Sequence, residues 1–299
     1  MGEVVECVPN FSEGRRREVV DRIVQSISSV PEIKILDVEM DGDHNRSVIT
    51  FVGNKSSVQE GAFLAARTAA ELIDLTKHSG EHPRMGALDV LPFIPIEGVT
   101  MKECADIAVA VGERIAKSLE IPVYLYEAAA RKPSRRQLEN VRRGQFEGIR
   151  ESIRTDETRR PDFGPRQVHP TAGAIAVGAR MPLIAFNINL DSQDLDAAKE
   201  IARTIRTSGG GLPHLKALGL RLEGKGLVQV SMNLTDYTIT SMSRVFDEVQ
   251  REANARGVQV AESEIIGLVP LDAVCDIAAR FLKLEKFENK QVLERRIWC

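Results

Sequence analysis

Apolar residues recur along the chain with two periods, and the order in which these periods alternate predicts two α/β halves. In the first half, a period of two predicts strands and a period of about 3.6 predicts helices. The predicted order is strand 4–8, helix 15–28, strands 33–39 and 47–52, helix 58–75 and strand 87–96. The last strand contains Pro92 and Pro95, so we expect it to bend or to lie at the edge of a sheet.

A second helix-rich stretch follows this pattern. Thr100 and Glu103 have the spacing of a capping box and predict the start of a helix, which a strand at 123–126 follows. The arginine-rich segment 131–154 is predicted to be helical and solvated. Residues 155–172 contain several prolines and little periodicity, which is typical of a loop or a domain junction.

The C-terminal half repeats the order of the first. The same periods predict strand 183–190, helix 194–207, a hairpin of strands 217–222 and 228–233, helix 240–256, strand 258–266 and helix 271–284. We therefore expect an α/β (α+β) protein of two ferredoxin-like βαββαβ subdomains, residues 1–172 and 173–299. The two subdomains are expected to pack together and to leave a substrate cleft between them.

Composition narrows the class of protein. Hydrophobic residues make up 43% and charged residues 28%, which excludes a collagen-like or wholly disordered chain. Forty Lys and Arg against 43 Asp and Glu provide no basic field for nucleic acid or an anionic membrane. The apolar runs are far shorter than the ~20 residues that span a bilayer, and no signal-peptide pattern is visible. Four scattered cysteines without CxxC spacing indicate reduced thiols, so we expect a cytoplasmic protein.

Two motif-like patterns do not fit their surroundings. The stretch 219–226 has the Gly and Lys spacing of a phosphate-binding loop, but it ends in Gly instead of Ser or Thr and leads into a strand. A hairpin turn is the better interpretation. His78 and His82 have the i, i+4 spacing of a zinc pair on a helix, which Pro83 and the preceding Ser-Gly would break. We therefore predict no metal site.

The densest polar cluster on an apolar background is the segment 78–89, between a long predicted helix and a strand. A histidine with an ordinary pKa of ~6.5, flanked by Glu81 and Arg84, suits proton transfer near neutral pH. A loop histidine that only bonds to the backbone fits the pattern equally well. His44-Asn45-Arg46 and His169-Pro170 are weaker cases of the same choice.

Glycine and arginine clusters leave further alternatives open. The triple glycine 209–211 follows a predicted helix, where a C-cap loop is favoured and close approach to a bound ligand is the alternative. The arginine clusters at 15–17, 135–136 and 142–143 are expected to be solvated faces. Their forked guanidinium groups would also suit carboxylates.

Long motifs across nearly the whole chain resemble those of the glutamate formiminotransferase family, in the family's order. They are VECVPNFSEGR at 5–15, NRSVITFVG at 45–53, GEHPRMGALDVLPFIP at 80–95, PVYLYEAAAR at 122–131, PDFGP at 161–165, GAR followed by PLIAFNINL at about 178–190, and VQVSMNLTDY at 228–237. The resemblance implies transfer of a formimino group between 5-formiminotetrahydrofolate and L-glutamate, in histidine degradation. In animals this unit is fused to a cyclodeaminase domain, which this chain is expected to lack.

The resemblance also implies site residues. The family's catalytic histidine lies in GEHPRMG and corresponds to His82. Because one histidine can move both protons of the transfer, we expect His82 to be the general acid–base, and Glu81 or Asp89 is our own candidate for an orienting carboxylate. Tetrahydrofolate is the expected cosubstrate, and neither a metal nor a nicotinamide is needed. The family's folate-binding stretches correspond to about 164–173 and 210–219. The expected folate contacts are Gly164, Pro165, His169, Pro170, Gly173, Gly210, Gly211, His214, Lys216 and Gly219.

For the amino-acid substrate we expect contacts from Arg46, Arg84 and Glu39. The family resemblance implies a homodimer, and folate and glutamate are the expected partners, with no nucleic acid or membrane. Two alternatives remain open. One is a formyltransferase of the same fold that acts on 5-formyltetrahydrofolate and glutamate, and the other is a folate-binding protein without turnover.

Overall fold

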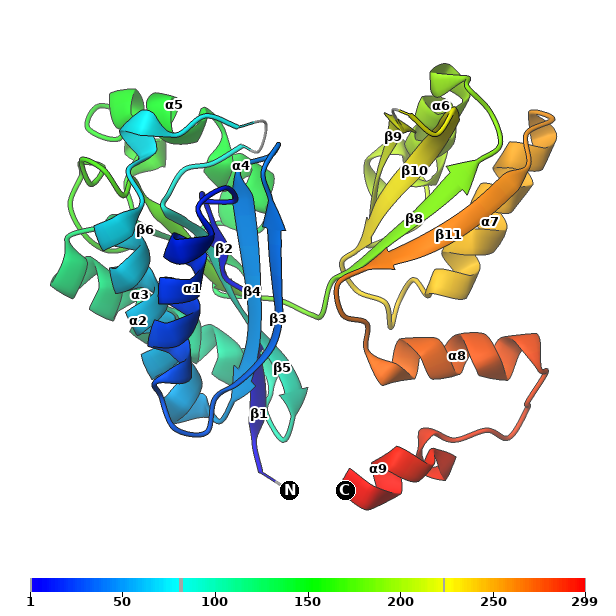
Figure 1. Cartoon of the computed structure of the whole chain (residues 1–299), viewed down its shortest axis with the longest axis horizontal. Helices are drawn as coiled ribbons and strands as arrows, with labels where there is room; N and C mark the ends of the chain where they lie inside the picture. The colour runs from blue at the N-terminus through cyan, green and yellow to red at the C-terminus, as the bar shows by residue number, and fades with distance from the viewer. Residues whose placement is uncertain (1, 81–82, 223, 299) are drawn as a thin grey trace. The chain divides into compact units, whose positions relative to one another are not determined.

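The computed structural model describes residues 2–80, 83–222 and 224–298, except for the side chains of the last two of these residues. The chain folds as two units, Met1–Arg180 and Met181–Cys299. Figure 1 labels the elements of both units.

The first unit contains a sheet and two sets of helices. Its described strands are β1 (Val4–Cys7), β2 (Asn10–Phe11), β3 (Lys34–Asp41), β4 (Arg46–Gly53), β5 (Leu88–Glu97), β6 (Val123–Glu127) and β7 (Ile175–Ala179). Its described helices are α1 (Arg17–Ser28), α2 (Lys55–Leu72), α3 (Met101–Leu119), α4 (Leu138–Arg142) and α5 (Gln145–Ser152). Short 3₁₀ turns are η1 (Leu75–Lys77), η2 (Pro133–Arg135) and η3 (Glu157–Arg159).

The strands of the first unit form one mixed sheet. β3 pairs with β4, β4 pairs with β1 and β2, and these two pair with β5, all antiparallel. β7 then pairs in parallel with β5 and with β6. The predicted strand–helix–strand–strand–helix–strand order is confirmed from β1 to β5, and β6 and β7 extend that ferredoxin-like arrangement at one edge.

β5 lies inside the sheet, which corrects the predicted edge position, one of the two alternatives given for this proline-containing strand. It pairs with β1 and β2 on one side and with β7 on the other. Proline lacks an N–H donor, but the Pro92 carbonyl still accepts a hydrogen bond from the Val8 N–H at 3.4 Å. The pairing of β5 with β1 and β2 also shifts register, so the ladder can accommodate a missing donor there.

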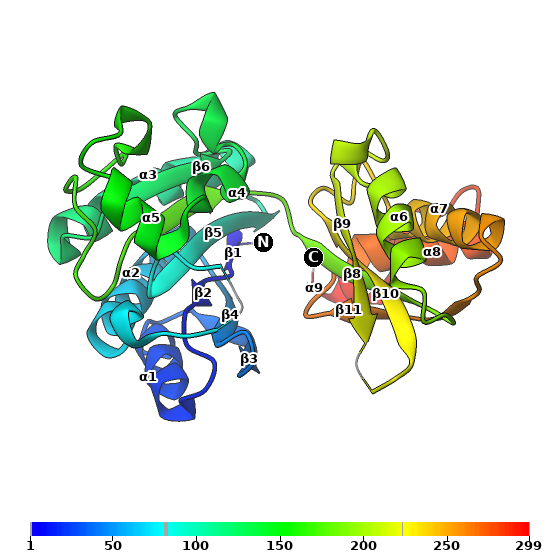
Figure 2. The same ribbon diagram turned by 90° about the horizontal axis from the view of Figure 1, so that it is seen from above.

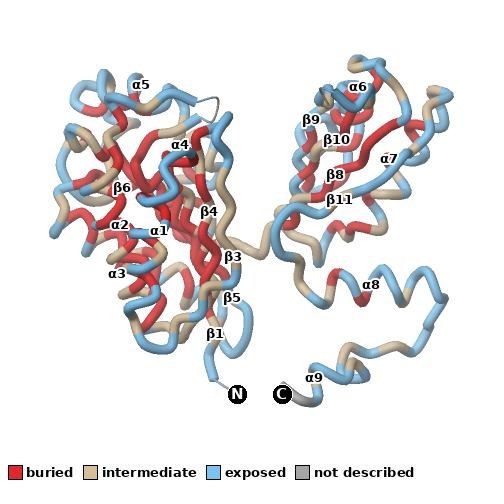
Figure 3. Tube along the Cα trace, in the orientation of Figure 1, coloured by how far each residue is buried: buried red, intermediate tan, exposed pale blue. Residues whose placement is uncertain are grey.

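Helices cover both faces of this sheet. α1, α2 and α3 pack against the face that carries Phe51, Phe93 and Leu125, and α4 and α5 against the face that carries Tyr126. Successive strand residues point to opposite faces, so β6 contributes to both clusters. Figure 3 shows the buried residues concentrated along these strands. The segment 131–154 is helical only in part, because Gly144 (φ 87°) separates α4 from α5.

The boundary between the two units lies directly after β7. The sequence predicts a boundary after residue 172, whereas the first unit extends to Arg180. β7 is buried along its whole length and belongs to the first sheet through its parallel neighbours.

The second unit has the predicted βαββαβ order. Its described elements are β8 (Ile184–Leu190), α6 (Leu195–Ile205), η4 (Thr207–Gly209), β9 (Leu215–Leu222), β10 (Leu227–Leu234), α7 (Met242–Ala255), β11 (Val260–Ile266), α8 (Leu271–Phe281), η5 (Asn289–Gln291) and α9 (Leu293–Trp298). The sheet order β11–β8–β10–β9, antiparallel throughout, is that of a ferredoxin-like unit. The α/β class with two subdomains is therefore confirmed.

α6 and α7 pack on one face of this second sheet, as Figure 2 shows. The strands alternate, and their other face carries amide and carboxylate side chains. Asn187 and Asn189 on β8 donate to Glu264 and Glu262 on β11, at 3.1 and 2.9 Å. Gln229 on β10 donates a hydrogen bond to Asn189 at 2.8 Å. Hydrogen-bonded polar side chains, instead of apolar ones, therefore cover that face of the sheet.

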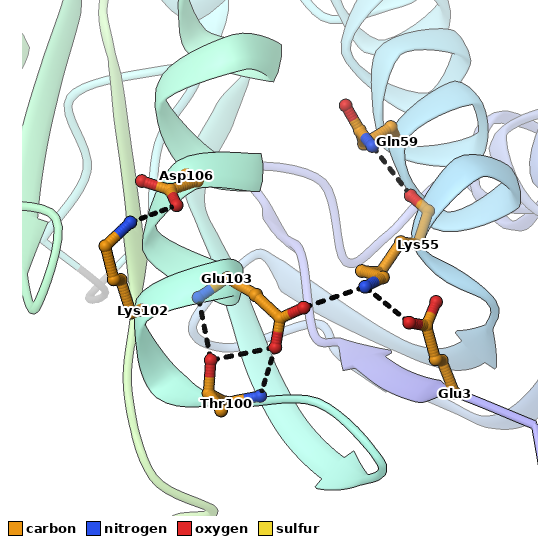
Figure 4. A network of polar contacts seen from close by, with 7 residues as sticks. All are labelled: Glu3, Lys55, Gln59, Thr100, Lys102, Glu103 and Asp106. Atoms are coloured by element: carbon orange, nitrogen blue, oxygen red, sulfur yellow. Dashed lines mark hydrogen bonds and ion pairs between the residues drawn. The ribbon is translucent and has the colours of Figure 1, made fainter.

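A network of charges joins the N-termini of α2 and α3 to β1 (Figure 4). Lys55 Nζ lies 2.5 Å from Glu3 Oε1 and 2.8 Å from Glu103 Oε1. Thr100 and Glu103 form the predicted capping box, in which each side chain accepts the backbone N–H of the other, at 3.2 and 2.8 Å. Hydrogen bonds from Lys55 and from the backbone and hydroxyl of Thr100 lower the pKa of Glu103 to about 2.

Replacing Thr100 with Ala should lower the free energy of unfolding by about 1 kcal/mol, because the Glu103 N–H loses its capping oxygen. Chemical denaturation measures this change. Thr155→Ala is the matched control, since Thr155 is exposed and its hydroxyl makes only a 3.5 Å hydrogen bond to the Ser152 carbonyl. Equal losses in the two variants would rule out a specific contribution of the capping box.

Candidate functional site

The polar segment singled out in the sequence lies in the first unit, between η1 and β5. Residues 78–80 follow η1, and residues 83–87 lead into β5. Glu81 and His82, the expected orienting carboxylate and acid–base, lie outside the described residues. The site is therefore built from the residues on either side of them.

Asn45 joins three loops around this segment. It is 8% exposed and has a left-handed backbone (φ 50°), which Asn adopts more readily than most residues. Its Oδ1 accepts the Gly14 N–H at 2.9 Å, and its Nδ2 donates to the Ser79 carbonyl at 2.9 Å. Its own carbonyl accepts from His78 Nε2 at 2.9 Å.

Two glycines let these loops approach so closely. A Cβ on Gly14 would overlap the Asp41 carbonyl oxygen and the Arg46 nitrogen. A Cβ on Gly80 would overlap the His44 carbonyl oxygen. Neither position can hold a side chain unless the backbone moves, so both glycines are part of the same junction.

His78 is held as a neutral ring. Its Nδ1 accepts from Arg84 Nε at 3.2 Å, and its Nε2 donates to the Asn45 carbonyl, which places the proton on Nε2. Burial lowers the pKa of His78, and the Arg84 charge adds to this effect, although the Asn45 carbonyl opposes it. Of the two alternatives left open for a histidine in this segment, backbone bonding describes His78.

Arg84 connects the segment to α5. Its Nη1 and Nη2 donate to the two carboxylate oxygens of Glu147 at 3.0 and 2.8 Å, while its Nε is used by His78. Most of its donors are therefore engaged within the protein. Its expected contact with a substrate carboxylate remains a prediction.

A second charged group surrounds Asp89 at the start of β5. Asp89 is 2% exposed, and its Oδ1 accepts the Met85 N–H at 2.6 Å. Its Oδ2 forms an ion pair with Arg142 Nη2 on α4. Asp89 thus has two partners in the protein, the second of which was not foreseen from the sequence.

Arg46, at the start of β4, is influenced by this group. Burial and the nearby Arg142 charge lower the pKa of Arg46, while Asp89 and Glu39 act in the opposite direction. On β3, burial and the neighbouring Asp37 raise the pKa of Glu39, which the Arg46 charge partly offsets. Arg46 thus lies within electrostatic reach of both Glu39 and Asp89.

The first expected folate stretch ends against the same segment. Gly173 has a left-handed backbone (φ 72°) and forms a bridge with Gly86. The Ala174 N–H donates to the Met85 carbonyl at 2.9 Å. His169 Nδ1 accepts the Ala172 N–H at 3.0 Å, which closes the turn between them. The end of this stretch therefore lies beside the residues that precede Asp89.

The other expected members of this stretch are less enclosed. Gly164 has a left-handed backbone (φ 87°), and Pro165 and Pro170 are exposed. Burial lowers the pKa of His169, with the Glu120 charge opposing it.

The second expected folate stretch belongs to the second unit. Gly210 (φ 85°) caps η4, and the Gly211 N–H donates to the Arg206 carbonyl at 3.1 Å, which is the favoured C-cap arrangement for the triple glycine. His214 has a left-handed backbone (φ 55°), and its carbonyl accepts the Thr235 N–H at 2.9 Å. Lys216 lies exposed on β9.

Gly219, the last residue of this stretch, lies where β9 meets α6. A Cβ there would overlap the backbone of α6 at Lys199. The glycine is thus required by packing, and 219–226 leads through a hairpin into β10 as predicted.

Within the part of the chain that the structure describes, no group of three or more His, Cys, Asp and Glu side chains is placed to hold a metal ion. None of the described helices combines the length and the apolar character needed to cross a membrane.

Comparison with known proteins identifies both units. Residues 4–180 match the family model described as the formiminotransferase domain, N-terminal subdomain, and residues 185–296 match the formiminotransferase domain. A glutamate formimidoyltransferase of Streptococcus pyogenes serotype M1 is 49% identical, with 99% of each chain covered. One from Thermoplasma acidophilum is 48% identical over 98% of this chain and 97% of its own. The formimidoyltransferase-cyclodeaminase of Mus musculus is 49% identical over 96% of this chain and 54% of its own.

Replacing Asn45 with Ala should lower the free energy of unfolding by about 3 kcal/mol, because the Gly14 N–H and the Ser79 carbonyl both lose a buried partner. Asn45→Gly is the matched variant, since glycine keeps the left-handed backbone and removes only the side chain. Chemical denaturation of both separates the two contributions. A loss of less than ~1 kcal/mol in the glycine variant would mean that these hydrogen bonds contribute little.

His78 should titrate below its ordinary pKa of 6.5 and carry its proton on Nε2 at neutral pH, which histidine NMR spectra measure. Because the folded pKa lies below the unfolded one, the related stability is complete above pH 6.5 and falls as the pH drops below it. Arg84→Leu should raise the midpoint, since it removes a neighbouring positive charge. Glu147→Gln keeps that charge and should leave the midpoint low; a midpoint at or above 6.5 in the unmodified protein would contradict the assignment.

Proposed function

The chain belongs to the formiminotransferase family, and from this we propose that it is a glutamate formimidoyltransferase. It transfers a formimino group between 5-formiminotetrahydrofolate and L-glutamate. The observation that carries this proposal is the identity to the streptococcal enzyme along nearly the full length of both chains. The sequence features of both subdomains are therefore shared with a protein of that named activity.

The reaction requires proton transfer at two nitrogens. The glutamate amine must lose a proton to attack the formimino carbon, and folate N5 must gain one to leave when the tetrahedral intermediate collapses. A single residue between them can accept the first proton and donate the second. We assign this role to His82, with Glu81 or Asp89 as the orienting carboxylate; acid–base catalysis of this kind contributes roughly 10²–10⁴-fold in rate.

The described residues on both sides of His82 are firmly anchored, which supports the assignment. Gly80 packs against the His44 carbonyl, and Met85 is bonded through its backbone to Asp89 and Ala174. Precise placement of reactants supplies much of the rate in a two-substrate transfer.

Tetrahydrofolate is the proposed cosubstrate, bound by residues 164–173 and 210–219. The contact of Gly173 with Gly86 supports the first stretch, since it lies beside the segment that carries the chemistry. Arg46, Arg84 and Glu39 are the proposed contacts for glutamate. We further propose a cytoplasmic homodimer; its described cysteines, Cys7, Cys104 and Cys275, are buried free thiols, which suits a reducing compartment.

The purified protein should consume N-formimino-L-glutamate only when tetrahydrofolate is present, and His82→Ala should lower kcat by at least ~10²-fold because proton transfer is lost. The absorbance of the folate product after acid conversion measures the turnover. His44→Ala is the matched control, because the His44 side chain is exposed and its hydrogen-bond partner among the described residues is Asp41.

The folate donor that the protein accepts distinguishes the formimidoyltransferase from the two alternative functions. Turnover with 5-formyltetrahydrofolate but not with the formimino donor would indicate the formyltransferase. Binding of folate without turnover of either donor would indicate a non-catalytic relative. An unchanged kcat in His82→Ala would reject the acid–base assignment while leaving the reaction itself intact.

A further inference from the structure

We propose that Arg46 and Arg142 together bind a carboxylate of the amino-acid substrate, and that Asp89 is a positioning residue that holds Arg142 for this purpose. The inference rests on the proposed function, since glutamate supplies the carboxylate. It adds Arg142, which the sequence placed in a solvated cluster, and gives the Asp89 carboxylate a structural role in substrate binding.

The first observation is that both guanidinium groups have unused donors in a buried place. The Nε atoms of Arg46 and Arg142 are inaccessible to solvent and have no hydrogen-bond partner among the described residues. A buried N–H without an acceptor costs about 1–3 kcal/mol, so such groups in a native protein call for an explanation. Both residues are partly exposed, so a ligand oxygen bound during the reaction would meet these guanidinium groups through their other N–H donors.

The second observation is that Arg46 has no direct carboxylate partner. Burial and the Arg142 charge lower its pKa, while the charges of Asp89, Glu39 and Asp41 act in the opposite direction. The Arg142 ion pair and the Met85 N–H already use both carboxylate oxygens of Asp89. Arg46 forms no ion pair within the described part of the chain, so its guanidinium group has no bonded anion among these residues.

The shape and charge of the guanidinium group indicate that the ligand is a carboxylate. Its N–H groups form a planar fork that matches the two oxygens of a carboxylate, and such bonds are about twice as strong as bonds between neutral groups. A substrate carboxylate between Arg46 and Arg142 would give these two guanidinium groups the acceptor that the described residues do not provide. Phosphate would also fit this fork, but neither substrate of the proposed reaction contains phosphate.

The position of the cluster fits the reaction. Arg46 directly follows Asn45, which contacts Ser79 and His78, and Asp89 is bonded to Met85. The cluster is therefore anchored to the same segment on which the proposed acid–base lies. Arg84 is a weaker candidate for this contact, because His78 and Glu147 already use its Nε and both Nη groups.

The test uses Arg46→Met, which keeps the length of the side chain and removes its charge, and Arg142→Lys, which retains a cation for Asp89. Each variant should raise the KM for N-formimino-L-glutamate by ~10–100-fold, the value of one or two charge-assisted hydrogen bonds. The KM for tetrahydrofolate should change by less than ~3-fold. Arg143→Met is the control, because Arg143 is the exposed neighbour of Arg142.

Stability separates substrate binding from a structural role. Arg46→Met removes a partly buried charge that has a like-charged neighbour and no ion pair among the described residues, so its Tm should be unchanged or higher. A lower Tm together with an unchanged KM for the glutamate substrate would overturn the inference. Equal effects of Arg46→Met and Arg143→Met on that KM would also overturn it.

Direct binding keeps this test independent of turnover. Calorimetric titration of L-glutamate in the presence of tetrahydrofolate should give a Kd that rises by ~10–100-fold in Arg46→Met and stays constant in Arg143→Met. If the unmodified protein binds glutamate but turns over no donor, the proposed reaction fails and the carboxylate site stands. If it binds no glutamate, or binds it equally in Arg46→Met, the carboxylate site is rejected.

Discussion

The buried amide of Asn45 is the interaction on which the arrangement of the site depends. One side chain satisfies a donor on the loop before α1 and an acceptor on the segment after η1, while its carbonyl receives the His78 ring. Because these three loops are far apart in the sequence, no local preference would bring them together. The left-handed backbone of Asn45 and the absence of side chains at Gly14 and Gly80 are the local conditions that make this junction possible.

Much of the fold could be predicted because each half follows a regular alternation of periods. The second unit has the predicted order of elements, and its sheet is antiparallel as in other ferredoxin-like units. β7 was missed for a physical reason. It lies between two parallel neighbours and is buried on both faces, so its residues are uniformly small or apolar and show no alternation. The prolines of β5 led to the wrong prediction of an edge strand, because proline is usually confined to edge strands. In this sheet the strand is instead paired on both sides.

The candidate site was predictable as a segment but not as a set of contacts. The density of polar residues at 78–89 singled out a segment that the structure ties to two other loops through Asn45, and the family resemblance supplied the proposed roles. The sequence could not show that Arg84 forms an ion pair with Glu147 or that Arg142 forms one with Asp89, because these partners are far apart along the chain. The assignment of 142–143 as a solvated cluster followed from composition alone. Only the tertiary contact separates the paired Arg142 from its exposed neighbour.

The junction at Asn45 also bears on how this protein can be engineered. Residues 41–44 form an exposed hairpin tip of the kind where insertions and tags are usually tolerated. Here an added residue would move Asn45 away from both of its side-chain partners, so the tip is a poor insertion point despite its exposure. The hairpin between β9 and β10 offers the better location, because residues 224–226 are exposed and the space around Gly224 is open, provided that Gly224 itself (φ 81°) is kept as glycine. A fluorescent label or affinity peptide placed there would leave the junction in the first unit intact.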